Sequence, residues 1–196
     1  MPILPEALPR RGNFLSRLVG RFVLKLLRWE ICGDPPSKEK FVAIAAPHTS
    51  NWDFVIGMAV IVGMGLDVHW LGKHTIFRPP FGPFFCWLGG IPVNRDAHVG
   101  VVEQTVQLFQ NHSKMILGLS PEGTRRKVEK WKTGFYHIAE KAQVPILLVA
   151  LDYSCRAVRF GPLLFPSGDL EKDMEKIRAF YADVKGKRPE LFNLGS

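Results

Sequence analysis

Two apolar segments of different character are joined by the heptapeptide PHTSNWD, residues 47–53. Residues 41–46 form a continuous apolar run of strand length, and residues 54–66 are apolar with small residues, as in a buried helix. The heptapeptide therefore lies where a strand passes into a helix, a common place for catalytic groups in α/β folds. It supplies a histidine, His48, and an aspartate, Asp53.

The spacing of His48 and Asp53 restricts how their side chains can meet. On one straight helix, five residues correspond to about 140° of rotation and about 7.5 Å of rise, so the two side chains would diverge. They meet if His48 precedes the helix and Asp53 lies in its first turn. Ser50 favours this arrangement, because it is a good N-cap with Asp53 three positions later, as in a capping box. From the spacing alone, Asp53 either only caps the helix or also orients His48.

Length, composition and charge limit the class of protein. A chain of 196 residues with 46% hydrophobic residues suits one globular domain. The net charge of +8 indicates an anionic partner, which is a membrane surface, a phosphorylated substrate or nucleic acid. Cys32, Cys86 and Cys155 show no metal-ligand spacing, so we expect buried, reduced thiols in a cytoplasmic protein and no metal site.

An amphipathic helix is predicted over residues 13–29. Its apolar residues recur with helical period, and its charged residues are all basic. Such a helix is typical of the membrane interface, so we expect residues 1–30 to attach to the cytoplasmic face of a membrane and residues 31–196 to form the domain. The alternative is an ordinary helix packed on the domain. The apolar residues are Phe14, Leu15, Leu18, Val19, Phe22, Val23, Leu26 and Leu27, and the basic ones are Arg17, Arg21, Lys25 and Arg28.

Strand-like runs alternate with helical periodicity through the rest of the chain. This alternation predicts an α/β fold, a single domain with a mixed, mostly parallel sheet flanked by helices. Residues 76–88 hold five aromatic residues among three prolines, which excludes a regular helix. This loop either lines an apolar tunnel or dips into lipid, or it covers the core. We expect strands at 41–46, 68–73, 89–95, 115–120, 144–151 and 157–160, and further helices at 54–66, 96–111, 133–142 and 169–185.

Polar groups follow several of the predicted strands. Lys73, Arg95 and Glu122 each come at or just after a strand end. Because such ends gather along one edge of an open α/β sheet, we expect these side chains near His48. A carboxylate at the end of a buried strand, such as Glu122, needs a partner, which is an arginine or a substrate hydroxyl. Arg125 and the two cations after it indicate a phosphate-binding loop or, alternatively, a solvated turn.

Residues 48–53, 90–95, 121–125 and 144–146 form four blocks, and in this order they resemble the glycerophospholipid acyltransferase family, typified by bacterial 1-acylglycerol-3-phosphate acyltransferases. The resemblance covers about residues 41–151. Ser120 and Pro92 depart from the family pattern, which usually has an aromatic residue at the first position and an aromatic or aliphatic residue at the second. Both positions flank the binding groups, so these departures concern the identity of the acceptor more than the reaction. Residues 48–53 are similar to the histidine-four-residues-aspartate block, 90–95 to the block ending in arginine, 121–125 to the Glu-Gly-Thr-Arg block and 144–146 to the Val-Pro block.

The resemblance implies transfer of a fatty acyl chain from acyl-CoA or acyl-carrier protein to the hydroxyl of a lysophospholipid, with 1-acylglycerol 3-phosphate as the first expectation. His48 would be the general base, and Asp53 would fix its tautomer. Residues 31–196 would then be the acyltransferase domain, and no cofactor is implied. The residues assigned to the phosphate and glycerol of the acceptor are Arg95, Glu122, Gly123, Thr124 and Arg125, with Lys73 as a further candidate.

Other functions stay open. The same chemistry serves a lyso-ornithine lipid or glycerol 3-phosphate as acceptor. A non-catalytic lipid-binding protein at the membrane surface would explain the basic helix and the aromatic loop, but not the four blocks in order. Nucleic-acid binding is supported only by charge, and no recognised motif is visible, so we expect no nucleic-acid partner.

Overall fold

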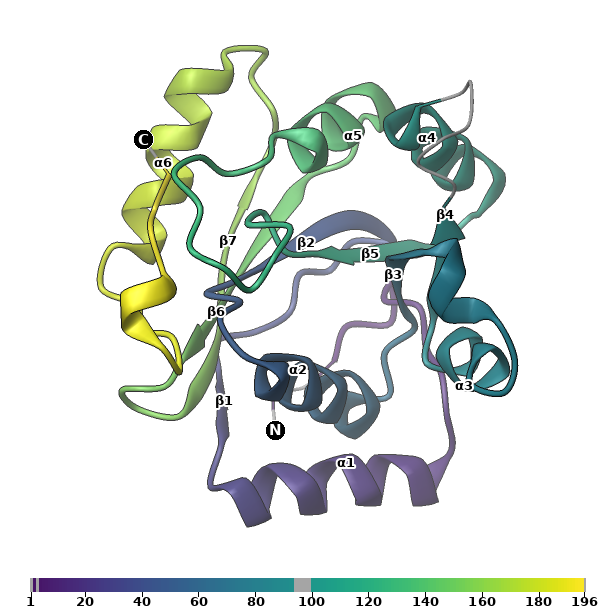
Figure 1. Cartoon of the computed structure of the whole chain (residues 1–196). Coiled ribbons are helices and arrows are strands. Elements are labelled where there is room, and N and C mark those ends of the chain that lie inside the picture. Colours follow the sequence, from purple (N-terminus) through teal and green to yellow (C-terminus); the bar gives the residue numbers. More distant parts are fainter. Residues whose placement is uncertain (1, 3, 94–99, 196) are drawn as a thin grey trace.

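A mixed seven-stranded sheet forms the centre of the described chain (Figure 1). The computed structural model describes residues 2, 4–93 and 100–195. The strand order is β1-β7-β6-β2-β5-β3-β4, and every neighbouring pair is parallel except β6 with β7. The predicted α/β fold with a mostly parallel sheet is confirmed. The strands are β1 (Glu30–Cys32), β2 (Lys40–Ala46), β3 (Val68–Lys73), β4 (Gly90–Val93), β5 (Met115–Leu119), β6 (Ile146–Asp152) and β7 (Ala157–Leu164).

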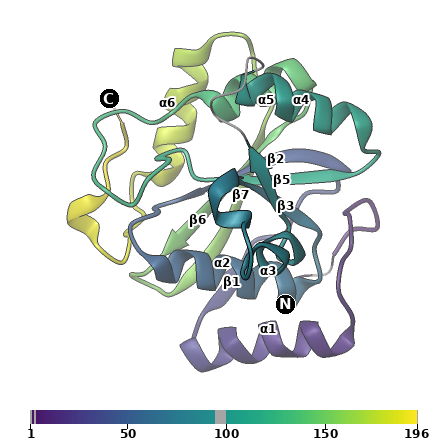
Figure 2. The same cartoon turned by 45° about the vertical axis from the view of Figure 1, so that its right-hand side comes forward.

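Helices cover the two faces of this sheet, with α1 and α2 on one face and α4, α5 and α6 on the other (Figures 1 and 2). Two 3₁₀ turns, η1 and η2, lie in the connections. Within the described residues, no helix is both long and apolar enough to cross a bilayer. The bounds are α1 (Phe14–Leu27), α2 (Asn51–Met64), η1 (His74–Phe77), α3 (Gly82–Trp87), α4 (Val101–Asn111), α5 (Gly134–Ala142), α6 (Leu170–Tyr181) and η2 (Pro189–Leu191).

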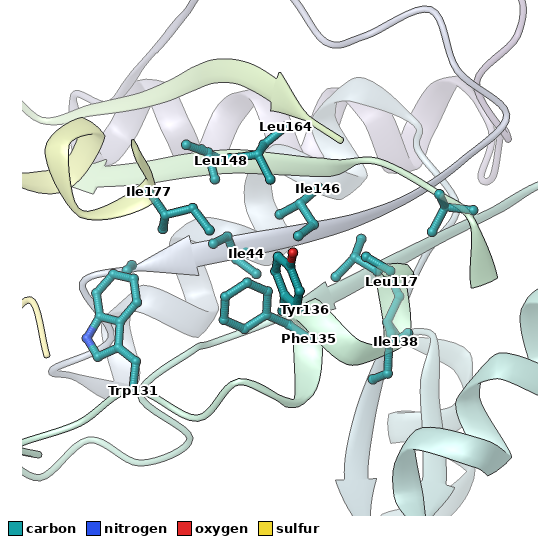
Figure 3. Packing of buried hydrophobic residues seen from close by; sticks show 14 of the residues in the cluster. Ile44, Leu117, Trp131, Phe135, Tyr136, Ile138, Ile146, Leu148, Leu164 and Ile177 are labelled. Atoms are coloured by element: carbon teal, nitrogen blue, oxygen red, sulfur yellow. The ribbon is translucent and has the colours of Figure 1, made fainter. Parts of the chain in front are cut away.

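The central strands are apolar on both faces, because each face is covered by helices. Successive residues of β2 alternate between the two cores: Phe41 faces the α2 side, and Val42 faces the α5 side. Every residue of β6 is buried. On the second face, Ile44 and Leu148 pack with Phe135 and Ile177 from α5 and α6 (Figure 3). This double burial fixes β2 in the middle of the sheet, and with it the start of the heptapeptide.

Helix α1 packs against α2 at one end of the molecule (Figure 1). Leu24 and the following Trp29 are buried in the same core as Ile56 of α2. The opposite side of α1 carries apolar side chains that are exposed, of which Phe14 is 81% exposed. The helix therefore combines a packed face with an exposed apolar face. The exposed apolar residues of α1 are Phe14, Leu15, Leu18, Val19, Phe22 and Leu26.

Several details of the sequence prediction were wrong. The proline-rich loop holds a short helix, α3, because Pro83 lies in its first turn, where a missing N–H is tolerated. Helix α4 begins at Val101 with Gly100 as N-cap, later than expected. The cysteines are free but exposed, since they lie in the short strand β1, in α3 and in the turn after β6.

Candidate active site

The heptapeptide joins β2 to α2, and the capping box predicted there is present. Ser50 is the N-cap of α2, and its side chain accepts a hydrogen bond from the backbone N–H of Trp52 at 3.2 Å. In return, the Ser50 backbone N–H donates to Asp53 Oδ2 at 2.6 Å. These bonds satisfy backbone donors that a helix start otherwise leaves free. They also fix the Asp53 side chain in the first turn, with His48 just before the helix.

His48 and Asp53 lie side by side. His48 Nδ1 is 3.6 Å from Asp53 Oδ2, which is ion-pair range but longer than a good hydrogen bond. The Asp53 side chain is fully buried, whereas 22% of the His48 side chain is exposed. One Asp53 oxygen therefore accepts the capping bond from the Ser50 N–H and also lies near the His48 ring, so capping leaves room for the orienting role.

The second Asp53 oxygen has a partner that the sequence did not reveal. Tyr153, the residue after β6, donates its hydroxyl hydrogen to Asp53 Oδ1 at 2.6 Å. The two residues are one hundred positions apart, and their contact has no periodic signal in the sequence. Only the position of Tyr153 at the end of a buried strand pointed to this edge of the sheet.

Glu122 is buried beneath the heptapeptide. The residue is 1% exposed and lies just after β5, the neighbour of β2. Its Oε1 accepts a hydrogen bond of 2.6 Å from the backbone N–H of His48. Burial raises the pKa of Glu122 to about 7, the charge of Asp53 adds to the rise, and the His48 N–H opposes it. Among the described residues, the hydrogen-bond partner of this carboxylate is the main chain of His48.

The electrostatic surroundings keep His48 neutral. Burial lowers the pKa of its imidazole below 6.5, Asp53 works in the opposite direction, and Arg125 adds to the lowering. A neutral imidazole with an orienting carboxylate is suited to accept a proton at neutral pH.

A cavity of about 1330 Å³ opens beside His48 and extends along the α2 face of the sheet. His48, Asp53 and Arg125 are polar residues of its lining. Much of the remaining wall is apolar and comes from the strands, from α2 and from the proline-rich loop. Residues that form these apolar walls include Phe41, Ala43, Met58, Val60, Ile76, Phe81, Phe85, Val149, Leu151 and Phe160.

The predicted binding residues are distributed unevenly around this cavity. Gly123, Thr124 and Arg125 line it, and Lys132 from the same loop joins them. Lys73, at the end of β3, is exposed and is not among the lining residues. Arg95 lies outside the described residues. Among the residues that the structure describes, no group of three or more His, Cys, Asp and Glu side chains has the geometry of a metal site.

The chain is similar in sequence to known acyltransferases. The chain is 27% identical over 172 residues to the 1-acyl-sn-glycerol-3-phosphate acyltransferase of Escherichia coli (strain K12), which covers 83% of this chain and 66% of that protein. It is 28% identical over 171 residues to the protein of that name from Salmonella typhimurium, again covering 83% of this chain. The chain thus spans slightly less than two thirds of the length of these relatives.

The fold is also similar to a solved structure. The crystal structure of the 1-acyl-sn-glycerophosphate (LPA) acyltransferase PlsC from Thermotoga maritima superposes with a TM-score of 0.60 and 17% identity, covering 86% of this chain and 78% of that chain. Residues 32–152 match the Acyltransferase family and contain His48, Asp53 and Glu122. This match covers more than half of the chain, so the protein belongs to the Acyltransferase family.

Proposed function

We propose that the protein transfers a fatty acyl chain from an acyl thioester, acyl-CoA or acyl-carrier protein, to the hydroxyl of a lysophospholipid. One observation carries this proposal: His48, with its Nδ1 3.6 Å from Oδ2 of the buried Asp53, lines a large and mostly apolar cavity. Family membership and the printed names of the relatives support the acyl-transfer chemistry.

In the proposed reaction, His48 takes the proton of the acceptor hydroxyl as its oxygen attacks the thioester carbonyl carbon. The tetrahedral intermediate collapses with cleavage of the carbon–sulfur bond, and the thiolate that leaves takes the proton from the imidazolium. Asp53 stabilises that imidazolium and keeps the ring in the orientation that faces the cavity. Glu122 accepts a hydrogen bond from the His48 backbone N–H and so helps to fix the main chain that carries this ring.

The apolar walls of the cavity suit an acyl chain, because they provide a dry surface next to the base. Ile76, Phe81 and Phe85 of the proline-rich loop contribute to these walls, which supports acyl-chain contact by this loop. Arg125 and Lys132, which also line the cavity, offer cations to a phosphate. This charge favours 1-acylglycerol 3-phosphate as acceptor, while glycerol 3-phosphate and a lyso-ornithine lipid remain acceptors to compare.

The membrane-facing side of the molecule is proposed to include α1 and α3. Arg11, just before α1, donates to the main-chain oxygen of Trp87 in α3, so the two helices are adjacent. Phe84 and Trp87 are exposed on α3, as are the apolar residues on the outer side of α1. Exposed apolar side chains next to cations are typical of interfacial binding to anionic lipid, and we place the protein at the cytoplasmic face on this basis.

The test is thiol release from acyl-CoA and from acyl-carrier protein, screened against a panel of lysolipids. The His48→Ala variant should lose about 10²–10⁴-fold in turnover and keep its thermal unfolding midpoint. His137→Ala, which removes a partly exposed histidine on α5, should retain wild-type turnover. A folded His48→Ala protein with wild-type turnover would refute the mechanism. Absence of thiol release by the wild type with every acceptor would favour a non-catalytic lipid-binding protein.

A further inference from the structure

The carboxylate of Asp53 is held at both of its oxygens. Oδ2 accepts from the Ser50 N–H at 2.6 Å and lies 3.6 Å from His48 Nδ1, and Oδ1 accepts from the Tyr153 hydroxyl at 2.6 Å. A carboxylate fixed at one oxygen can still rotate about its terminal bond. A short, charge-assisted bond at the second oxygen removes that freedom. The Ser50 N–H and the Tyr153 hydroxyl together fix the carboxylate with Oδ2 toward His48.

Tyr153 is itself rigidly placed. Its backbone N–H donates to the carbonyl of Lys185 at 2.8 Å, which ties the end of β6 to the segment after α6. Its ring packs edge-on against buried Trp29, with 4.8 Å between centroids and 82° between planes. Burial and the neighbouring Asp53 charge raise the pKa of the Tyr153 phenol well above its usual value, so the hydroxyl keeps its proton and acts as a donor.

The same C-terminal segment also contacts the heptapeptide directly. The backbone N–H of Arg188 donates to Thr49 Oγ1 at 3.2 Å. Gly186 lies so close that a Cβ there would be 2.9 Å from Pro47 Cβ and 3.0 Å from Thr49 Oγ1. The heptapeptide is thus held by residues that follow position 152, where the match to the Acyltransferase family ends.

We propose that Tyr153, fixed by the segment 185–188, is a positioning residue that holds Asp53 in the orientation required by His48. The inference rests on the proposed function. Tyr153 is not among the residues that line the cavity, so we expect it to act through Asp53 without touching substrate.

The test uses Tyr153→Phe, which keeps the ring and removes only the hydroxyl. We expect kcat to fall about 10- to 100-fold, because small displacements of catalytic groups have effects of this size, with KM for donor and acceptor unchanged. Without its fixed carboxylate, His48 loses part of the attraction that raises its pKa. The acid limb of the kcat profile and the His48 imidazole titration followed by NMR should therefore both move to lower pH.

The matched control is Tyr136→Phe. The Tyr136 hydroxyl also donates to a buried carboxylate, Asp173 Oδ2 at 3.1 Å, but this pair lies between α5 and α6, away from His48. The control should lose thermal stability and leave kcat, the pH profile and the His48 titration unchanged.

Two outcomes would overturn the positioning role. The first is a Tyr153→Phe protein with wild-type kcat, or with a raised KM as its only change. The second is an unchanged or raised His48 pKa in that variant. The NMR titration needs no substrate, so it decides the point even if the wild type shows no thiol release, a result that would count against the proposed function alone.

Discussion

The Glu122 carboxylate lies at the end of β5 with almost no exposure to solvent, and its pKa of about 7 has a consequence for stability. The ordinary value for this group is 4.5, so the folded state binds a proton more tightly than the unfolded state. A group of this kind stabilises the fold fully below pH 4.5, and its contribution is lost as the pH rises through about 7. The pKa of His48 is lowered, so its contribution to stability changes with pH in the opposite direction.

Glu122→Gln isolates this contribution. A glutamine can still accept the His48 N–H bond but has no proton to exchange. We expect the free energy of unfolding of the wild type, relative to the variant, to fall by on the order of 3 kcal/mol between pH 4.5 and 8. Urea unfolding across this pH range measures the difference.

The control for Glu122→Gln is Glu103→Gln, which removes a contribution to stability with the opposite pH dependence. Glu103 is exposed, and its hydrogen bond with Lys141 lowers its pKa, so Glu103→Gln removes stability that is present at neutral pH and lost in acid. If the free energies of unfolding of Glu122→Gln and of the wild type changed with pH in parallel, Glu122 would titrate normally in the folded protein.

At this scale, the sequence revealed the parts of the site that are local. Ser50 and Asp53 are three residues apart, and the capping box follows from that spacing alone. The bonds of His48 to Glu122 and of Asp53 to Tyr153 join positions 74 and 100 residues apart. Such contacts depend on the order of strands in the sheet, which no local pattern specifies.

At the scale of elements, the close packing of α1 on α2 depends on Gly20. A Cβ at Gly20 would lie 2.3 Å from the backbone nitrogen of Gly63 and 2.7 Å from its Cα. Because the obstructing atoms are backbone, no side-chain movement relieves the overlap. The helices approach this closely only without a side chain at position 20.

Gly20→Ala should therefore destabilise the protein by about 1–3 kcal/mol, since α1 must move away from α2. Gly57→Ala is the matched control on α2, because a Cβ at that position meets no atom within 4 Å. It should be neutral or stabilise by up to about 1 kcal/mol through helix propensity. Chemical unfolding of both variants measures the effect. Equal stabilities would show that the helices are not in close contact.

Elements with a long apolar signal were predictable, and elements without one were not. The continuous apolar runs at β2, α2 and β6 identified these elements, because runs of this kind are typical of strands and helices packed in a core. Strand β1 has only three residues, with no apolar pattern, and was missed. The sequence also did not indicate whether β7 pairs parallel or antiparallel to β6, since pairing direction depends on the connection rather than on residue type.

For the whole molecule, the net charge of +8 and the exposed apolar face of α1 both support the proposal that the protein binds an anionic membrane. The sequence suggested either a membrane helix or a packed helix. The structure shows that α1 packs through Gly20 and Leu24, while Phe14 and Phe22 stay exposed. A deletion of α1 would open the core, so surface substitutions test membrane binding better.

A triple variant, Phe14→Gln with Phe22→Gln and Leu26→Gln, should bind anionic vesicles more than about tenfold more weakly, because it removes apolar area that enters lipid. Its unfolding midpoint should match that of the wild type. Phe165→Gln, which replaces an exposed phenylalanine after β7, should bind vesicles normally. Co-sedimentation with phosphatidylserine vesicles at low and high salt measures this. Undiminished binding by the triple variant would exclude α1 as the contact surface.

The antiparallel step from β6 to β7 has a consequence for the order in which the site forms during synthesis. Because β7 runs back across the sheet, α6 leads the chain to the edge where β2 and β6 end, and residues 185–188 arrive beside Thr49. His48 leaves the ribosome early, yet its supports from Glu122, Tyr153 and Gly186 follow much later. A nascent chain therefore lacks these contacts around the heptapeptide until residues 185–188 have been added.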